Sequence, residues 1–261
     1  MRILTFLMVV LIPVFPSAQS IVGEWDSYTS VLNVANLIVD DDYVYGASSG
    51  GLVVLDKTTE QFDIYTVRDG LSRNDIACIA EDKFGDLWLG MNAPDGEINI
   101  WDKQSKSVKK EFAGMSFGDN LTSITSMAFH DNIAFAVYQL GVDWGIAYFK
   151  VANGEYIYQD RFEGFRDQVI RINSITILRD TLWVSTYSGV QYADLDELDG
   201  MKSGEAWHSV NFQNPGSATE VIEYNQSLVV GIAKEVYEVR GNQARGFPLL
   251  KERNCGKSTR V

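Results

Sequence analysis

Hydrophobic and polar positions alternate in short runs along the chain, and turn-forming residues separate the runs. The clearest example is residues 70–90, GLSRNDIACIAEDKFGDLWLG. It contains a turn, an apolar strand from Asp75 to Ala80, an acidic and glycine-containing connection, and a second strand over Leu87–Leu89. Long stretches with the 3.6-residue period of a helix are lacking. The pattern therefore predicts short antiparallel strands.

The second strand of this unit recurs along the chain as three mainly apolar residues followed by Gly, Ala or Ser. The small residues are at positions 46, 90, 136, 185 and 231, so the copies are 44, 46, 49 and 46 residues apart. A period of about 40–50 residues with several short strands per unit is typical of propeller blades. We expect Gly46, Gly90, Ala136, Ser185 and Gly231 to occupy matching places, where a larger side chain could collide with the next blade.

Each copy has an apolar run before it and one or two strand-like runs after it, which predicts an all-β fold. The fold class expected is a β-propeller of four-stranded antiparallel blades, either a small ring or the N-terminal part of a larger one. The propeller domain is predicted over residues 21–250. Its repeat units lie near 31–70, 71–118, 119–168, 169–217 and 218–250.

The two ends of the domain are less regular. Residues 21–29 resemble an outermost strand, which would complete the last unit and close the ring. That last unit loses its pattern after Val239. Residues 251–261 form a polar tail, at which a longer chain could have been truncated.

Residues 1–20 have the pattern of a secretory signal peptide. Arg2 is followed by an apolar run over residues 3–12, and Ala18-Gln19-Ser20 is a small-x-small cleavage site. No later stretch approaches the ~20 apolar residues of a membrane helix. The mature chain is therefore predicted to be extracytoplasmic, whether periplasmic, surface-exposed or secreted, with no integral membrane segment.

The charge balance narrows the class of partner. The chain has 22 Lys and Arg against 35 Asp and Glu, a net charge of −13, and removing Arg2 with the signal makes it −14. Nucleic acid is disfavoured as a partner because phosphate binding needs a basic surface. A protein or a surface glycan is the partner expected.

The sequence offers no pattern that requires a catalytic or metal site. Asp41 and Asp42, like Glu81, Asp82 and Asp86, fall at hairpin corners where acidic residues favour the turn. Cys78 lies in an apolar strand and is expected to be a buried free thiol. No catalytic residue, cofactor or metal is predicted.

Function in propellers usually lies on the loops at one end of the axis. The candidate ligand-binding residues are those that lead into the inner strands, although turn formation alone would also explain them. A lengthened hairpin places Trp144 at the surface, whereas Trp88 and Trp183 share one repeat position and should pack between blades. The candidates on the axial face are Asn33, Arg73, Asn74, Thr122, Ser123, Arg171 and Asn173.

The segment GLSRNDIACIAEDKFGDLWLG, followed by GEINIWD, resembles the repeat of two-component-regulator propellers. Residues 23–102 are similar to the start of PorZ-like proteins of the type IX secretion system, which are exported propellers that act in cargo delivery. The resemblance implies a non-enzymatic scaffold that binds protein or glycan. The alternatives are the ligand-sensing propeller of a two-component regulator, and a lyase or hydrolase on a propeller fold.

Overall fold

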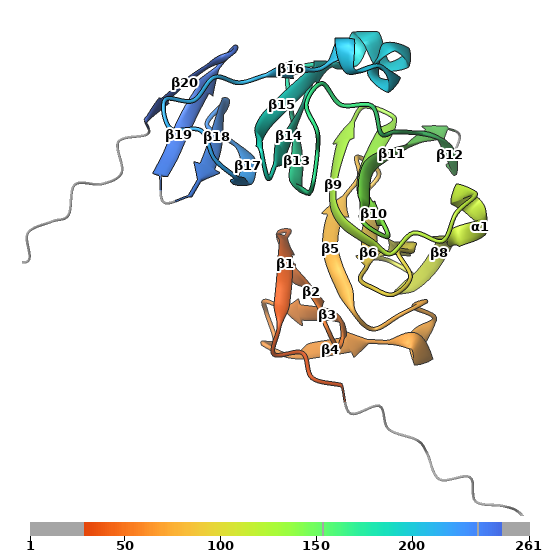
Figure 1. Ribbon diagram of the computed structural model, residues 1–261. Helices are drawn as coiled ribbons and strands as arrows, with labels where there is room; N and C mark the ends of the chain where they lie inside the picture. Colours follow the sequence, from red (N-terminus) through yellow and green to blue (C-terminus); the bar gives the residue numbers. More distant parts are fainter. Residues whose placement is uncertain (1–28, 153, 234, 247–261) are drawn as a thin grey trace, which may run out of the picture.

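The computed structural model describes residues 29–152, 154–233 and 235–246, which form five four-stranded antiparallel sheets. In each sheet the strands follow chain order, and the first strands of successive sheets contact one another. The sheets succeed one another along an arc, as Figure 1 shows. The predicted all-β propeller with four-stranded blades is confirmed. The predicted signal peptide, residues 21–28 and the polar tail lie outside the described residues.

The strands keep to the expected order of the repeat. Blade 1 contains β1 (Val34–Val39), β2 (Tyr43–Ser48), β3 (Gly51–Asp56) and β4 (Phe62–Tyr65). Blade 2 contains β5 (Ile76–Glu81), β6 (Leu87–Met91), β7 (Ile98–Asp102) and β8 (Ser107–Phe112). Blade 3 contains β9 (Ser123–His130), β10 (Ile133–Leu140), β11 (Asp143–Ala152) and β12 (Glu155–Phe162).

Blade 4 contains β13 (Ile172–Leu178), β14 (Thr181–Thr186), β15 (Gly189–Asp194) and β16 (His208–Ser209). Blade 5 contains β17 (Ala218–Tyr224), β18 (Ser227–Ile232), β19 (Glu235–Arg240) and β20 (Gln243–Gly246). Four short helices lie between strands: η1 (Val67–Asp69), α1 (Gly114–Phe117), η2 (Leu195–Lys202) and η3 (Gly204–Ala206). Among the described residues, no helix has the length and apolar character needed to cross a membrane.

A β-bulge interrupts the inner strand of every blade. The register with the second strand shifts at Ala35, Ala77, Thr125, Asn173 and Thr219, each the unpaired residue between two paired ones. A bulge adds one residue to one strand of a pair and increases the local twist. Because it recurs at the same place, it provides a structural alignment of the blades.

This alignment corrects the expected places of two small residues. The residues opposite the end of the bulge are Ala47, Gly90, Val137, Ser185 and Gly231. Ala47 is buried against blade 2, whereas a Cβ on Gly46 would point to Leu37 and Val53 of its own sheet. Gly46 and Ala136 are therefore one residue away from the position that Gly90, Ser185 and Gly231 occupy in their blades. The sequence alignment missed this because the size of a side chain does not mark the bulge.

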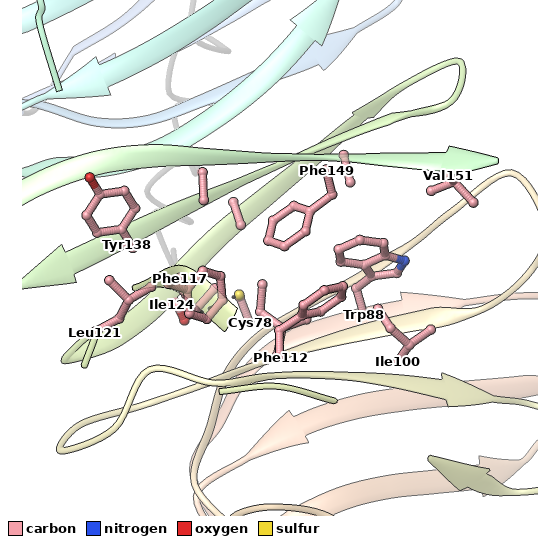
Figure 2. Close-up of a cluster of buried hydrophobic side chains, with 14 residues drawn as sticks. Cys78, Trp88, Ile100, Phe112, Phe117, Leu121, Ile124, Tyr138, Phe149 and Val151 are labelled. Atoms are coloured by element: carbon pink, nitrogen blue, oxygen red, sulfur yellow. Dashed lines mark hydrogen bonds between the residues drawn. The ribbon is translucent and has the colours of Figure 1, made fainter. Parts of the chain in front are cut away.

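The cores lie between neighbouring blades, where aromatic rings from both sheets interlock. Trp88 is fully buried and makes an edge contact with Phe149, their ring centroids 5.3 Å apart. Phe112 and Phe117 complete this cluster between blades 2 and 3, shown in Figure 2. Trp183 is 7 % exposed and packs in the cluster between blades 4 and 5. The two equivalent tryptophans thus face the next blade along the chain.

The last blade has its own outer strand, β20, which pairs with β19. The sequence pattern predicted instead that residues 21–29 would complete this blade. Strand β20 has the sequence QARG, and an exposed polar edge strand carries little hydrophobic periodicity. The expectation that the last unit must borrow a strand is therefore wrong.

The two ends of the arc expose different surfaces. The outer face of blade 1 is apolar, with Leu37, Val39 and Phe62 each more than half exposed. Cross-strand pairing places Val44, Val53, Leu55 and Ile64 on the same face. The outer face of blade 5 is mixed: it carries the charged cross-strand pair Glu238 and Arg245 beside Ile222 and Tyr224, which are 46% and 55% exposed. Among the described residues, β17 makes no contact with β1 comparable to those between the other inner strands.

Candidate functional site

The inner strands all begin at one end of the blades, which we call the connection face. The loops between blades and the hairpins joining second and third strands lie there. In each blade a backbone hydrogen bond ties the hairpin to the inner-strand approach. The donors and acceptors are Ser49 N to Asn33 O, Asn92 N to Asp75 O, Thr122 N to Gln139 O, Tyr187 N to Arg171 O, and Ala233 N to Ser217 O.

Two buried amide side chains fix the connections more firmly. Asn99, fully buried in β7, accepts a hydrogen bond from the backbone N–H of Ser72 at 2.8 Å. Gln191, at the equivalent place in β15, accepts one from the N–H of Arg166 at 3.1 Å. Buried backbone donors need such partners, because an unpaired one is costly. These two amides tie the connections 66–75 and 163–171 to the third strands of blades 2 and 4.

Most of the predicted binding residues take part in this internal bonding. Arg73 pairs with Asp95, and its Nε lies 3.8 Å from Glu97 Oε2. Asn74 Oδ1 accepts from the N–H of Val67 at 2.9 Å. In blade 3, Thr122 Oγ1 accepts a hydrogen bond from the Gly141 N–H at 2.9 Å. The neighbouring Ser123 is buried, and its Oγ lies 3.4 Å from Gln139 Oε1.

The other predicted residues differ in how much of the side chain is available. Asn33 is exposed at the start of blade 1. Asn173 Nδ2 donates to the Ala218 carbonyl at 2.6 Å, and so links blades 4 and 5. The Arg171 guanidinium lies over the Trp144 ring, 5.8 Å from its centroid. The structure therefore brings Arg171 and Trp144 together, whereas the other predicted residues are spread over blades 1 to 4.

Three exposed apolar residues belong to the loop and the two hairpins that carry or adjoin this pair, and they were not predicted from the sequence. Val142 is 85 % exposed, Ile170 58 % and Tyr187 59 %. Val142 is in the same hairpin as Trp144, and the backbone of Tyr187 bonds to that of Arg171. We call Val142, Trp144, Ile170, Arg171 and Tyr187 the blade 3–4 patch. Apolar residues at turn positions, where polar ones are usual, were the available sequence signal.

A cavity of about 460 Å³ adjoins the patch beside Trp144. Its wall includes Arg161, which pairs with Glu163 at 3.1 Å and with Asp119 at 2.7 Å. Glu163 also accepts a hydrogen bond from the Tyr138 hydroxyl. Burial, and then this bond, raise the pKa of Tyr138 well above its usual range, so the phenol stays protonated. The cavity therefore presents an ion-pair network beside the half-buried Trp144 ring.

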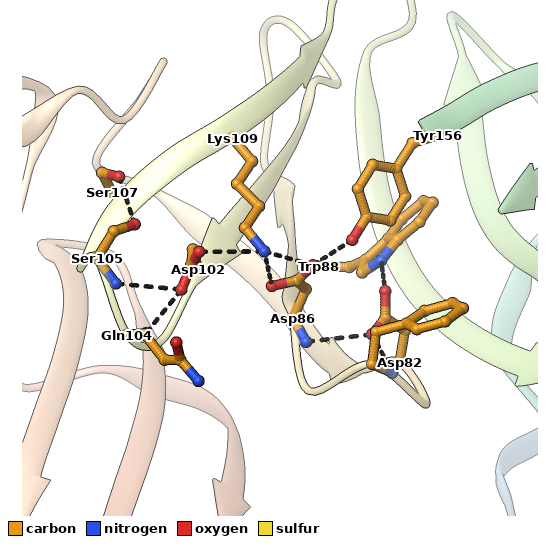
Figure 3. A network of polar contacts seen from close by, with 10 residues as sticks. Asp82, Asp86, Trp88, Asp102, Gln104, Ser105, Ser107, Lys109 and Tyr156 are labelled. Carbon is orange, nitrogen blue, oxygen red and sulfur yellow. Dashed lines mark hydrogen bonds and ion pairs between the residues drawn. The ribbon is translucent and has the colours of Figure 1, made fainter. Parts of the chain in front are cut away.

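The acidic residues of the β5–β6 hairpin in blade 2 lie at the opposite end of the blades, and their carboxylates are taken up by internal hydrogen bonds and an ion pair. Asp82 accepts from the Trp88 indole N–H at 3.1 Å and from two backbone N–H groups of its own turn. Asp86 is buried, binds Lys109 Nζ at 2.7 Å and accepts from the Tyr156 hydroxyl (Figure 3). In the part of the chain that the structure describes, no three His, Cys, Asp or Glu residues gather as metal ligands would.

The repeated blades and their loop face define the class as a β-propeller. The two component regulator propeller family matches residues 70–93, the unit in which the repeat is most complete. The match confirms the propeller repeats that the sequence resembles. A comparison with curated proteins finds no match.

Solved structures show the same fold at low identity. PorZ, an essential surface component of the type IX secretion system of Porphyromonas gingivalis, is 15% identical with a TM-score of 0.61, over 81% of this chain and 33% of PorZ. The extracellular domain of the putative one component system BT4673 from B. thetaiotaomicron is also 15% identical, with a TM-score of 0.61, over 84% of this chain and 28% of that one. The chain thus spans about a third of these neighbours.

An enzyme also has this fold. The gluconolactonase XC5397 from Xanthomonas campestris is 13% identical with a TM-score of 0.51, over 75% of this chain and 67% of its own. Likeness at such identities concerns the fold, which hosts many functions.

Proposed function

We propose that the protein is an extracytoplasmic, non-enzymatic propeller scaffold that binds a protein partner through the blade 3–4 patch. The observation that carries the proposal is a group on the connection face, in which Arg171 and Tyr187 are exposed beside half-buried Trp144 and two exposed aliphatic residues. Trp, Tyr and Arg are the residues most enriched among those that dominate protein-binding energy. Exposed apolar residues that cluster, rather than occur singly, mark such interfaces.

The hydrogen bonds that anchor the loops of the patch support the same function. The loop before β13 is held by Gln191, and the hairpin after β14 is tied to it through the Tyr187–Arg171 backbone bond. A surface that is already ordered loses little conformational entropy on association. The aromatic side chains of the patch also have few rotatable bonds.

The export pattern at residues 1–20 supports an extracytoplasmic location, and the resemblance to PorZ-like proteins supports a role in a type IX secretion system. Both can be tested together. Cells that produce the full chain are fractionated, and the recovered protein is sequenced from its N-terminus. A mature chain that begins at Ile21 in the extracytoplasmic fraction is expected. A chain that retains residues 1–20 in the cytoplasm would contradict the location.

The patch is tested by site-specific photo-crosslinking in the producing cells. A photoreactive phenylalanine replaces Tyr187, and in a matched control it replaces Phe84, which is 56% exposed in the β5–β6 hairpin at the other end of the blades. A discrete crosslinked protein is expected from position 187 only. The double substitution Trp144→Ala, Arg171→Ala should abolish it. Equal products at both positions, or none at 187, would refute the assignment.

A second candidate is the ligand-sensing propeller of a two-component regulator. It is favoured by the family match over residues 70–93 and by the similarity to the BT4673 extracellular domain. The complete reading frame distinguishes the two. A transmembrane helix and a kinase domain encoded with this propeller would replace the scaffold proposal by the sensor.

A further inference from the structure

A second cavity, of about 600 Å³, lies between blades 4 and 5 at the end opposite the connection face. Hairpins from both blades line it and contribute Arg179, Asn225, Gln226 and Arg240. Trp183, from the interior of blade 4, also lines this cavity. The wall thus combines two cationic groups with two amides and one indole.

The Trp183 indole N–H is buried and has no hydrogen-bond acceptor among the described residues. The equivalent indole in blade 2, that of Trp88, donates to the Asp82 carboxylate at 3.1 Å (Figure 3). Both tryptophans occupy the same place, two residues before the bulge position at Gly90 and Ser185. A buried donor without an acceptor is unusual in a folded protein. Blade 2 therefore shows which group satisfies this indole.

Hairpin length explains the difference between the blades. Residues 82–86 connect β5 to β6, and the first of them, Asp82, folds back to Trp88. Only Arg179 and Asp180 connect β13 to β14. Asp180 is exposed and lies 3.4 Å from His130 Nε2 in blade 3, away from the cavity between blades 4 and 5. Blade 4 consequently has the indole donor without an internal carboxylate to accept from it.

The charges around the cavity suit a carboxylate from outside. Arg179 forms no ion pair with any described residue, in a chain with a net charge of −13. Arg240 shares its charge with Glu238, at 2.8 Å. An unpaired guanidinium binds carboxylates through two parallel N–H groups. The amides of Asn225 and Gln226 can both donate to and accept from hydroxyl groups.

We propose that this cavity binds a small hydroxylated carboxylate, specifically a uronic acid of one or two sugar rings. The ligand carboxylate takes the role at Trp183 that Asp82 has at Trp88, and pairs with Arg179. The sugar hydroxyls bond to Asn225 and Gln226. The site is independent of the blade 3–4 patch, since the two share no residue and lie at opposite ends of the blades.

Isothermal titration calorimetry of the purified chain with galacturonic acid, and with galactose as the neutral match, tests the proposal. Galacturonic acid should bind, and galactose should bind at least about tenfold more weakly, because it lacks the charge-assisted bonds. Trp183→Phe, which keeps the ring and removes the N–H, and Arg179→Gln should each weaken binding about tenfold. Trp88→Phe, outside the cavity, should leave the affinity unchanged.

Thermal unfolding of each variant establishes that it is folded. Equal affinity for galactose and galacturonic acid would overturn the proposal, as would no binding of galacturonic acid or an unchanged affinity in folded Trp183→Phe. Binding of a short acidic peptide in place of the sugar acid would reassign the carboxylate to a protein. None of these results bears on crosslinking at Tyr187, so the two proposals fail separately.

Discussion

Substitution of Gly90 by alanine tests how tightly neighbouring blades pack. A Cβ on Gly90 would lie 2.6 Å from Cys78 Sγ and 2.8 Å from both Ile124 Cγ2 and Met127 Cε. Two of these three atoms belong to blade 3, so its inner strand must move or its side chains must leave their preferred rotamers. An extra methyl group in a packed core costs about 1–3 kcal/mol.

The replacement also has a favourable effect that must be subtracted. Alanine restricts the unfolded chain more than glycine does, which stabilises by about 0.4–1 kcal/mol where the backbone conformation is compatible. The backbone of Gly90 is not in the left-handed region. The net loss expected for Gly90→Ala is therefore about 1–2 kcal/mol, which lowers Tm by about 2–8 °C in a chain of this size.

Gly46→Ala is the matched control. This glycine is in the second strand of blade 1, but its Cβ would meet its nearest neighbour, Leu37 Cδ2, at 3.3 Å on the outer face. Leu37 is 58% exposed and free to move, so the change should be within about 0.5 kcal/mol. Urea unfolding followed by tryptophan fluorescence measures both variants. If Gly90→Ala is as stable as Gly46→Ala, the blades do not pack as closely as the structure indicates.

Three further predictions concern polar and titratable groups. Asn99→Leu should lower the free energy of unfolding in urea by about 1–3 kcal/mol, because the Ser72 N–H loses its acceptor. The same variant should be cleaved faster by a protease within residues 66–75. An unaltered cleavage rate would contradict this role of Asn99. Burial raises the pKa of the Cys78 thiol to about 12, so in a Cys255→Ser background the native protein should resist iodoacetamide. Its unfolding free energy should also fall as the pH rises above about 9, because the thiol then ionises more readily in the unfolded chain. Rapid alkylation of the native protein would refute the burial. A hydrogen bond from the Ser105 backbone N–H, and then the Lys109 ammonium, lower the pKa of Asp102. The ionised carboxylate therefore stabilises the fold above about pH 4, and this stabilisation is lost as the pH falls through the folded pKa. Asp102→Asn should flatten this loss in an acid unfolding curve, and an unchanged curve would contradict the assignment.

The repeat and the class of fold could be predicted from the sequence because blade strands leave a strong periodic pattern. The register could not, since a bulge adds a residue without changing side-chain type. Val137 illustrates the difficulty: it occupies the place that glycine occupies at Gly90. The outer strand β20 was missed because its polar residues resemble a loop.

The candidate site was predictable only in part. The position of the connection face follows from topology, whereas Trp144, predicted to stand at the surface, is half-buried against the core between blades 3 and 4. The sequence does not show that the Asn74 and Thr122 side chains hydrogen-bond within the loops, because their partners are the backbone N–H groups of Val67 and Gly141. The orphan indole of Trp183 required comparison of two hairpins in three dimensions.

Asn99 and Gln191 hold the backbone of the loops between blades. The support of these loops is therefore independent of the side chains at their tips. The amides hold main-chain atoms, so they place no demand on which side chains project from the tips. Residues such as Val142 and Tyr187 can consequently be exchanged over generations while the framework stays intact. A lineage could thereby acquire new binding specificities on an unchanged support.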